Sequence, residues 1–135
     1  MNGRVVLELP ARAEYLLLAR LAITGVGRSA GASEETLADL KLAITEAVAN
    51  AVKHAYPEGE PGRITVELSA SAQRLEVAVS DAGRGLRPGN AEPPADDGPR
   101  EEGMGLSIIR AIADEVELGP GPDGLGTSVR FACAL

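Results

Sequence analysis

The sequence has few aromatic residues. It contains no tryptophan, and its tyrosines and phenylalanine are Tyr15, Tyr56 and Phe131 alone. Proteins that hold single-stranded nucleic acid stack the bases on such rings. Basic residues are also in the minority, since 13 Lys and Arg oppose 20 Asp and Glu, for a formal net charge of −7. An acidic chain repels phosphate backbones, so the composition argues against direct binding of nucleic acid.

A second cysteine and a long apolar run are missing as well. Cys133 is the only cysteine, so no internal disulfide can form, and a reducing compartment fits. The first ten residues, MNGRVVLELP, contain no apolar signal core. The best apolar run, residues 15–26, is interrupted by Arg20 and is too short to span a bilayer. We therefore expect a cytoplasmic protein with no membrane attachment.

The chain does have enough hydrophobic residues, 44% of 135, to build one aliphatic core. We expect a single domain over residues 1–135. Apolar and polar residues alternate in 64–70 and in 74–80, and this period of two predicts a hairpin of two strands with a turn at 71–73. Further strands are expected at 4–9, 116–118 and 127–134, and helices at 11–23, 33–55 and 106–114.

Ser33 is expected to cap the second helix, with Glu34 and Glu35 in its first turn. Residues 82–105 are rich in Gly, Pro and acidic residues and hold little that could be buried. A loop of this length in a small domain favours a functional lid.

The helix at 33–55 carries a polar line that its core does not need. At about 100° per residue, Glu46, Asn50 and His54 share one stripe, flanked by the small Ala43 and Ala47, which would let a bulky ligand approach. The expected core residues lie on the opposite side: Leu37, Leu40, Ile44, Val48, Ala51 and Ala55. An ordinary solvated face is the alternative, and for His54 a bond to carbonyls at the helix end is favoured.

Three further features fall after the hairpin. Asp81 continues the inward-facing row of its strand, where a carboxylate is costly unless it meets hydrogen-bond donors. Gly103 and Gly105 precede the expected helix at Leu106, where backbone N–H groups can hold an anion. Thr127 follows Gly126 and has the parity of the inward residues of the last strand. Taken singly, each feature has an ordinary alternative. Asp81 could cap an exposed turn, Gly103 and Gly105 could belong to a flexible loop, and Thr127 could be a β-branched strand residue with no further role.

The order of these features is more specific than any one of them. The segments EAVANAVKHAY, VSDAGRGL, EEGMGLSIIRAIADEVEL and GTSVRF resemble the nucleotide-binding domain shared by gyrase, Hsp90, histidine kinases and MutL. Within this superfamily, the GHKL or histidine-kinase-like ATPases, the sequence is most similar to bacterial anti-sigma factor serine/threonine kinases. The resemblance implies the Bergerat ATP-binding fold, an α+β two-layer sandwich with a mixed, mostly antiparallel sheet and helices on one face.

The resemblance also implies roles for individual residues. Glu46 would act as base toward the attacking hydroxyl, Asn50 would hold Mg²⁺, and Asp81 would accept a hydrogen bond from the adenine amino group, supported by Thr127. A lid would cover about residues 86–102. Further contacts to ATP or ADP are implied for Lys53, His54, Gly83, Gly85, Leu86, Arg100, Gly103, Met104, Gly105 and Leu106.

One position departs from the pattern of some relatives. They carry a basic residue that reaches the terminal phosphate where this sequence has Glu101. Arg100, one position earlier, or Arg84 would then have to serve.

The function implied is that of an anti-sigma factor and ATP-dependent serine kinase, which binds a sigma factor, phosphorylates an anti-anti-sigma protein and forms a homodimer through the exposed side of its first strand. The alternative is a nucleotide-gated binding module that transfers nothing. The catalytic domain of a histidine kinase is less favoured, because we see no phospho-acceptor helix pair before Arg4.

Overall fold

The computed structural model describes residues 3–54, 62–82, 101–121 and 126–135, with only the backbone described for His54 and residues 101–106. Within these ranges the chain forms one five-stranded sheet in the order β1-β2-β3-β5-β4, and every strand pair is antiparallel. The elements are β1 (Gly3–Pro10), the short 3-10 helix η1 (Ala13–Tyr15), α1 (Leu16–Ser29), α2 (Glu34–His54), β2 (Arg63–Ala70), β3 (Arg74–Asp81), α3 (Glu101–Ile112), β4 (Glu115–Pro120) and β5 (Thr127–Ala134).

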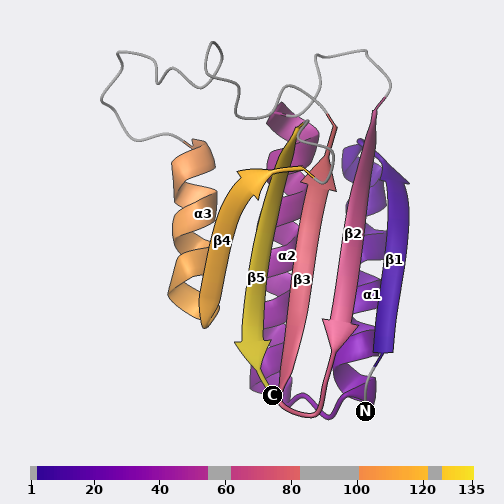
Figure 1. The fold of residues 1–135 in the computed structure, drawn as a ribbon, viewed down its shortest axis with the longest axis vertical. Helices are drawn as coiled ribbons and strands as arrows, with labels where there is room; N and C mark the ends of the chain where they lie inside the picture. Colours follow the sequence, from indigo (N-terminus) through magenta and orange to yellow (C-terminus); the bar gives the residue numbers. More distant parts are fainter. Residues whose placement is uncertain (1–2, 55–61, 83–100, 122–125) are drawn as a thin grey trace.

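The helices lie on one side of this sheet, so the predicted α+β two-layer arrangement is confirmed (Figure 1). α1 packs on α2 and lies behind β1 and β2, whereas α3 lies beside β4 at the opposite edge and also contacts α2. No helix in the described ranges is long and apolar enough to cross a membrane.

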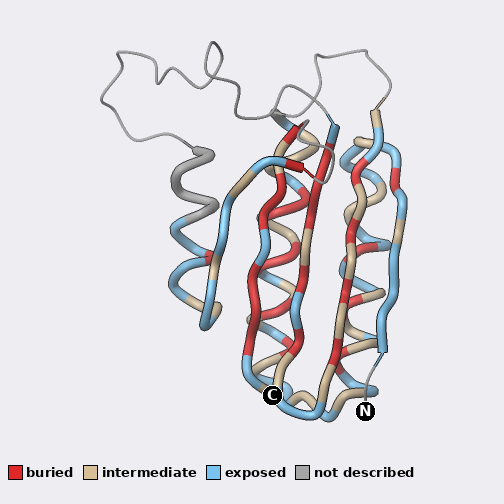
Figure 2. Tube along the Cα trace, in the orientation of Figure 1, coloured by how far each residue is buried: buried red, intermediate tan, exposed pale blue. Residues whose placement is uncertain are grey.

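The core lies between α2 and the middle of the sheet, and Figure 2 shows the buried residues gathered there. The alternation in β2 and β3 puts the predicted sets, such as Val66 and Val79, on the helix side in register. Ala43 and Ala47, however, are buried in this core, so the expectation that they leave room for a ligand is wrong. Their small side chains instead let α2 approach the sheet closely.

Two helices also differ from the prediction in where they begin or end. α1 begins after η1 and continues to Ser29, past the expected break, because Gly27 packs against α2: a Cβ there would lie 2.6 Å from Leu37 Cδ2. The break comes at Gly31, which has a φ of +90°. α3 begins at Glu101 rather than Leu106. Helix-interior glycine costs only about 1 kcal/mol relative to alanine, and an acidic first turn favours a helix N-terminus.

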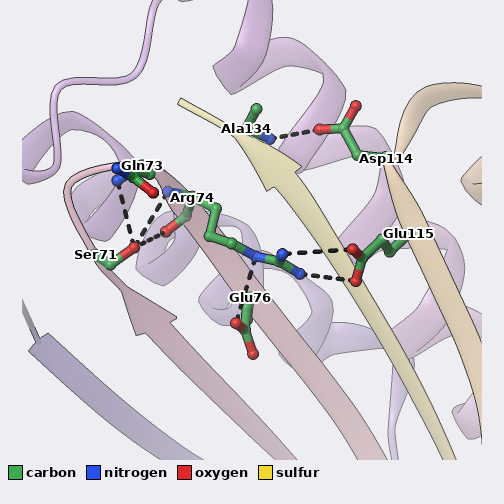
Figure 3. A network of polar contacts seen from close by, with 7 residues as sticks. All are labelled: Ser71, Gln73, Arg74, Glu76, Asp114, Glu115 and Ala134. Carbon is green, nitrogen blue, oxygen red and sulfur yellow. Dashed lines mark hydrogen bonds and ion pairs between the residues drawn. The ribbon is translucent and has the colours of Figure 1, made fainter.

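The end of the sheet that holds the β2–β3 hairpin is fastened by polar contacts (Figure 3). Arg74 on β3 reaches across β5 to Glu115 on β4, with Nη2 donating to Oε1 at 2.9 Å, and this bond holds the pKa of Glu115 below its ordinary value. Asp114 accepts from the Ala134 backbone N–H at 2.6 Å. Ser71 bonds the Arg74 backbone and closes the hairpin turn. These contacts fix where β4 joins the sheet, directly after α3.

Replacing Ser33 with alanine should remove the cap of α2. The backbone N–H of Thr36 donates to Ser33 Oγ at 3.1 Å, as expected for an N-cap residue. We predict that Ser33→Ala lowers the free energy of unfolding by about 1 kcal/mol, measured by urea denaturation. Ser29→Ala, at the end of α1, is the matched control and should change it by less than about 0.5 kcal/mol. Equal effects of the two substitutions would contradict the capping role.

The Cys133 thiol should be unreactive in the folded protein. Burial, followed by the negative charges of Asp114 and Asp39, raises its pKa to about 11. We predict that iodoacetamide at pH 8 leaves native Cys133 unmodified over a time in which the denatured chain, with a thiol pKa of about 8.5, is fully alkylated. Because the unfolded thiol ionises first, stability should also fall as the pH rises from about 9 toward 11. Rapid labelling of native protein at pH 8 would contradict this.

Candidate functional site

Several predicted site residues meet at the end of the molecule opposite the hairpin. The C-terminal end of α2, the end of β3, the start of β5 and the beginning of α3 all lie there (Figure 1). Contacts of α2 with β3, β5 and α3 join these elements. Residues far apart in sequence therefore converge at one end, as a binding site requires.

Asp81 is the last residue of β3 and lies on the helix-facing side, as its parity predicts. It is opposite Ile64 in the β2 register, and its exposed fraction is only 8%. A carboxylate at this depth is costly unless hydrogen-bond donors reach it. A hydrogen-bond acceptor buried in this way has the chemistry that an amino group on a ligand would need.

Gly126 lies directly on the backbone that follows Asp81. Its φ is +70°, and a Cβ added there would lie 1.9 Å from the Asp81 carbonyl oxygen and 2.8 Å from Ala82 Cα. Such distances exclude any side chain. The glycine before Thr127 is thus required by a close approach of two chain segments, and it fixes the start of β5 beside the end of β3.

Thr127 follows at once and is partly buried. The β3–β5 register places Ser80 opposite Ser128, so continuing it by one residue in each strand leads to Asp81 and Thr127. Two polar side chains of like parity thereby reach the same end of the sheet.

Glu46 and Asn50 lie one helical turn apart on α2, and both are partly buried. Side chains on a fully solvated face would be more exposed. Glu46 and Asn50 therefore lie at the edge of the packed face of α2. Lys53, one residue before the helix end, is exposed. A carboxylate and an amide so placed can act on a ligand above the core, the carboxylate as a proton acceptor and the amide as a donor or a metal ligand.

The remaining predicted residues are only partly within the description. Gly83, Gly85, Leu86 and Arg100, with most of the expected lid, lie outside the described residues. For His54, Gly103, Met104, Gly105 and Leu106 the structure gives the backbone alone. The expectation that Gly103 and Gly105 precede the helix is wrong, because both are inside α3.

Asn50 is the residue predicted to hold Mg²⁺. In the described ranges no three His, Cys, Asp or Glu side chains come together in a way that could hold a metal ion. Mg²⁺ typically keeps few protein ligands and completes its shell with water and phosphate oxygens. Asn50, beside Glu46, therefore suits an ion that arrives with a nucleotide.

Two features of the helix-free face of the sheet were not predicted. Ser80 and Ser128 are buried, at 8% exposure each, although their parity places them on the helix-free face. A hollow of about 520 Å³ also lies on that face, lined by residues that include Arg74, Glu76, Glu115, Glu117 and Arg130. It is separated from Glu46 by the sheet and takes no part in the candidate site.

Comparison with known proteins gives a consistent result. The family model described as "Histidine kinase-like ATPase domain" matches residues 9–133. The serine-protein kinase RsbW of Listeria monocytogenes serovar 1/2a is 40% identical over 126 residues, which cover 87% of this chain and 80% of that protein. RsbW of Oceanobacillus iheyensis is 34% identical over 123 residues, covering 84% and 77%.

A solved structure supports the fold. The crystal structure of the RsbU and RsbW domains of a Mycobacterium tuberculosis protein aligns with a TM-score of 0.71 at 22% identity. The alignment covers 97% of this chain and 32% of that longer chain. At this identity the likeness concerns the arrangement of helices and strands.

Replacing Gly126 with alanine should damage both the fold and the site. A left-handed φ costs a non-glycine residue about 1–2 kcal/mol, and the new methyl group would also strike the Asp81 carbonyl. We predict a loss of at least about 2 kcal/mol in the free energy of unfolding. Gly119→Ala, where a Cβ meets nothing within 4 Å, is the control and should cost much less. A tolerated Gly126→Ala would refute the close approach.

Proposed function

Because the chain belongs to the histidine kinase-like ATPase family, and within it to the group of RsbW serine-protein kinases, we propose that it is an ATP-dependent protein serine/threonine kinase. The observation that carries this proposal is that partly buried Glu46 and Asn50 lie in the C-terminal half of α2, which packs against β3, the strand that ends at buried Asp81. Phosphoryl transfer from ATP requires a group that accepts a proton and a group that holds the metal ion. A further group must accept a hydrogen bond from the adenine amino group.

In this proposal the nucleotide enters with its base toward Asp81. The buried carboxylate accepts the adenine amino N–H, and Thr127 supports that contact directly or through water. A hydrogen bond to a charged group contributes about 1.5–3 kcal/mol, so this bond would account for about ten- to a hundredfold in nucleotide affinity. The glycines at 83 and 85 would let the backbone approach the nucleotide.

The phosphates then lie toward α2. Asn50 would hold Mg²⁺, and the bound ion would neutralise negative charge on the phosphates. Glu46, one turn away, accepts the proton of the attacking serine hydroxyl, a step that contributes about 10²–10⁴-fold to the rate. Residues near the start of α3, Met104 and Leu106 among them, complete the contacts to the nucleotide together with Lys53 and His54. Arg100 or Arg84 would reach the terminal phosphate.

We further propose that the serine belongs to an anti-anti-sigma protein and that the same chain sequesters a sigma factor in the cytoplasm. The support is membership of the RsbW group. A homodimer through β1 is part of this proposal, since β1 is an edge strand with Val5 and Val6 exposed at 36% and 49%. Apolar side chains on an unpaired edge favour association with another chain.

One observation favours the second candidate, a nucleotide-gated module that transfers nothing. Glu101 is the first residue of α3, the place where the helix dipole would otherwise attract a phosphate. Its negative charge opposes an anion there unless a lid arginine compensates.

Glu46→Gln separates the two candidates. We predict that it abolishes transfer from labelled ATP to serine of the purified anti-anti-sigma partner, by about 100-fold or more, because the amide cannot accept the proton. Nucleotide affinity, measured by calorimetry with ADP and Mg²⁺, should remain within about threefold. ATP binding by the unmodified chain without any transfer would instead support the nucleotide-gated module.

Asp81→Asn should weaken nucleotide binding itself. An amide accepts the adenine amino group less strongly than a carboxylate, so we predict about ten- to a hundredfold weaker ADP binding and the loss of most of the thermal shift that the nucleotide gives. Glu117→Gln, an exposed carboxylate on β4, is the matched control and should bind ADP normally. Unchanged ADP affinity in Asp81→Asn would reject the proposed adenine contact.

A further inference from the structure

Two serines on the helix-free face of the sheet are buried without a hydrogen bond. Ser80 on β3 and Ser128 on β5 lie opposite each other in the strand register, and each is exposed at only 8%. Neither hydroxyl has a hydrogen-bond partner in the part of the chain that the structure describes. A buried hydroxyl is costly unless a partner reaches it. Ser128 also lines a hollow of about 320 Å³, where a ligand would supply that partner.

Arg130 lines the same hollow, two residues further along β5, and its side chain is exposed. The other arginines on this face of the sheet each contact a glutamate: Arg4, Arg63 and Arg74. Arg130 contacts no acidic side chain within the described ranges, although Glu117 lies directly opposite on β4. A planar guanidinium suits a carboxylate, which it binds through two parallel hydrogen bonds. Arg130 and the Ser128 hydroxyl together therefore have the chemistry of a carboxylate site.

A second, larger hollow begins at the same place. Arg130 and Glu117 line both hollows, and the larger one measures about 520 Å³. The carboxylates that line it come from different strands of the sheet: Glu67, Glu76, Glu115 and Glu117. Arg74 and Arg130 oppose them, and Arg74 already contacts Glu76 and Glu115 (Figure 3). The remaining excess of negative charge favours ammonium groups in this hollow.

From these observations we propose that the helix-free face binds a small zwitterion of the basic amino acid class. Its carboxylate pairs with the Arg130 guanidinium and accepts a hydrogen bond from the Ser128 hydroxyl. Its ammonium groups lie in the larger hollow, toward Glu117 and the other glutamates there. An anion alone would be repelled by those glutamates, and a cation alone would leave the Ser128 hydroxyl without an acceptor. A molecule that carries both charges satisfies both groups of side chains.

The ordinary alternative is an ion pair between Arg130 and Glu117, which are opposite each other in the β4–β5 register. An exposed pair of this kind contributes little to stability. A ligand can therefore take its place at small cost, because it offers the same two charges together with an acceptor for the buried Ser128 hydroxyl.

The proposed site and the candidate nucleotide site lie on opposite faces of the same strands. Ser80 and Ser128 are the direct chain neighbours of Asp81 and Thr127, whose parity places them on the helix side. Neither Arg130 nor Ser128 belongs to the nucleotide site. The proposal therefore does not depend on phosphotransfer, and its test contains no nucleotide.

The test is an NMR titration of the isotopically labelled full chain with three related ligands. L-Lysine carries both charges, cadaverine is lysine without the carboxylate, and L-norleucine is lysine without the side-chain ammonium group. We expect L-lysine to shift the amide signals of Glu117, Ser128 and Arg130 with a dissociation constant on the order of 1 mM, because the ligand is small. Cadaverine and norleucine should each bind at least about tenfold more weakly.

Gly119→Val is the most informative variant. Gly119 lies opposite Ser128 and lines the smaller hollow, and a Cβ added there would meet nothing within 4 Å. Valine suits a strand better than glycine, so the Tm should not fall. Its side chain would nevertheless occupy the hollow, and lysine binding should weaken by at least about tenfold.

Two further variants test the carboxylate site itself. Arg130→Gln should weaken lysine binding by at least about tenfold, because the amide cannot replace the charged fork. Ser128→Ala should weaken it by about tenfold without lowering the Tm, since the hydroxyl has no hydrogen bond to lose in the free protein. Arg110→Gln, an exposed arginine on α3, is the matched control and should bind lysine normally.

Four results would overturn the proposal. The first two are no shift at a lysine concentration about tenfold above the expected dissociation constant, and equal affinity for lysine, cadaverine and norleucine. The third is unchanged lysine binding by Gly119→Val that keeps its Tm. The fourth is a shift of the same signals with protein concentration in the absence of any ligand, which would assign the face to a second copy of the chain. A short peptide that ends in lysine distinguishes the remaining source of this chemistry: binding as tight as that of free lysine would assign the site to protein C-termini instead.

Discussion

The contact between Gly126 and the backbone after Asp81 is the constraint on which the candidate site depends. Two chain segments approach so closely that even a methyl group is excluded. This contact fixes the beginning of β5 against the end of β3, and the antiparallel register then aligns the two strands over the rest of their length. Asp81 and Thr127 are brought to one end of the sheet as a consequence. The absence of a side chain at Gly126 thus allows Asp81 and Thr127, 46 positions apart in the chain, to share one site.

The two ends of the sheet are used in different ways. At the hairpin end, Arg74, Asp114 and Glu115 join β3, β4 and β5 (Figure 3). At the other end, the buried carboxylate of Asp81 and the partly buried pair on α2 leave polar groups in reach of a ligand. The aliphatic core between α2 and the sheet supplies stability along the whole length (Figure 2), so polar residues at one end can be kept for binding.

Much of this arrangement was predictable from the sequence, because two kinds of local signal are strong here. The alternation of apolar residues predicted β2, β3 and the inward direction of Asp81, and Ser33 predicted where α2 begins. What failed depended on tertiary contacts. Gly27 was expected to end a helix, but in the fold it lies inside α1 and Leu37 packs on it. Ala43 and Ala47 were expected to leave room for a ligand, but they are buried in the core. The burial of Ser80 and Ser128 has no local signal, since parity places them on the helix-free face.

The central claim is that adenosine nucleotide occupies the end of the fold where α2, β3 and β5 meet. The most direct measurement is an NMR titration of the isotopically labelled chain with a non-hydrolysable ATP analogue and Mg²⁺. The account predicts that the amide signals of Glu46, Asn50, Asp81, Ala82 and Thr127 shift and saturate together, while those of the Ser71–Arg74 turn stay in place. Shifts confined to the hollow around Arg74 and Glu115, or none at millimolar analogue, would contradict it.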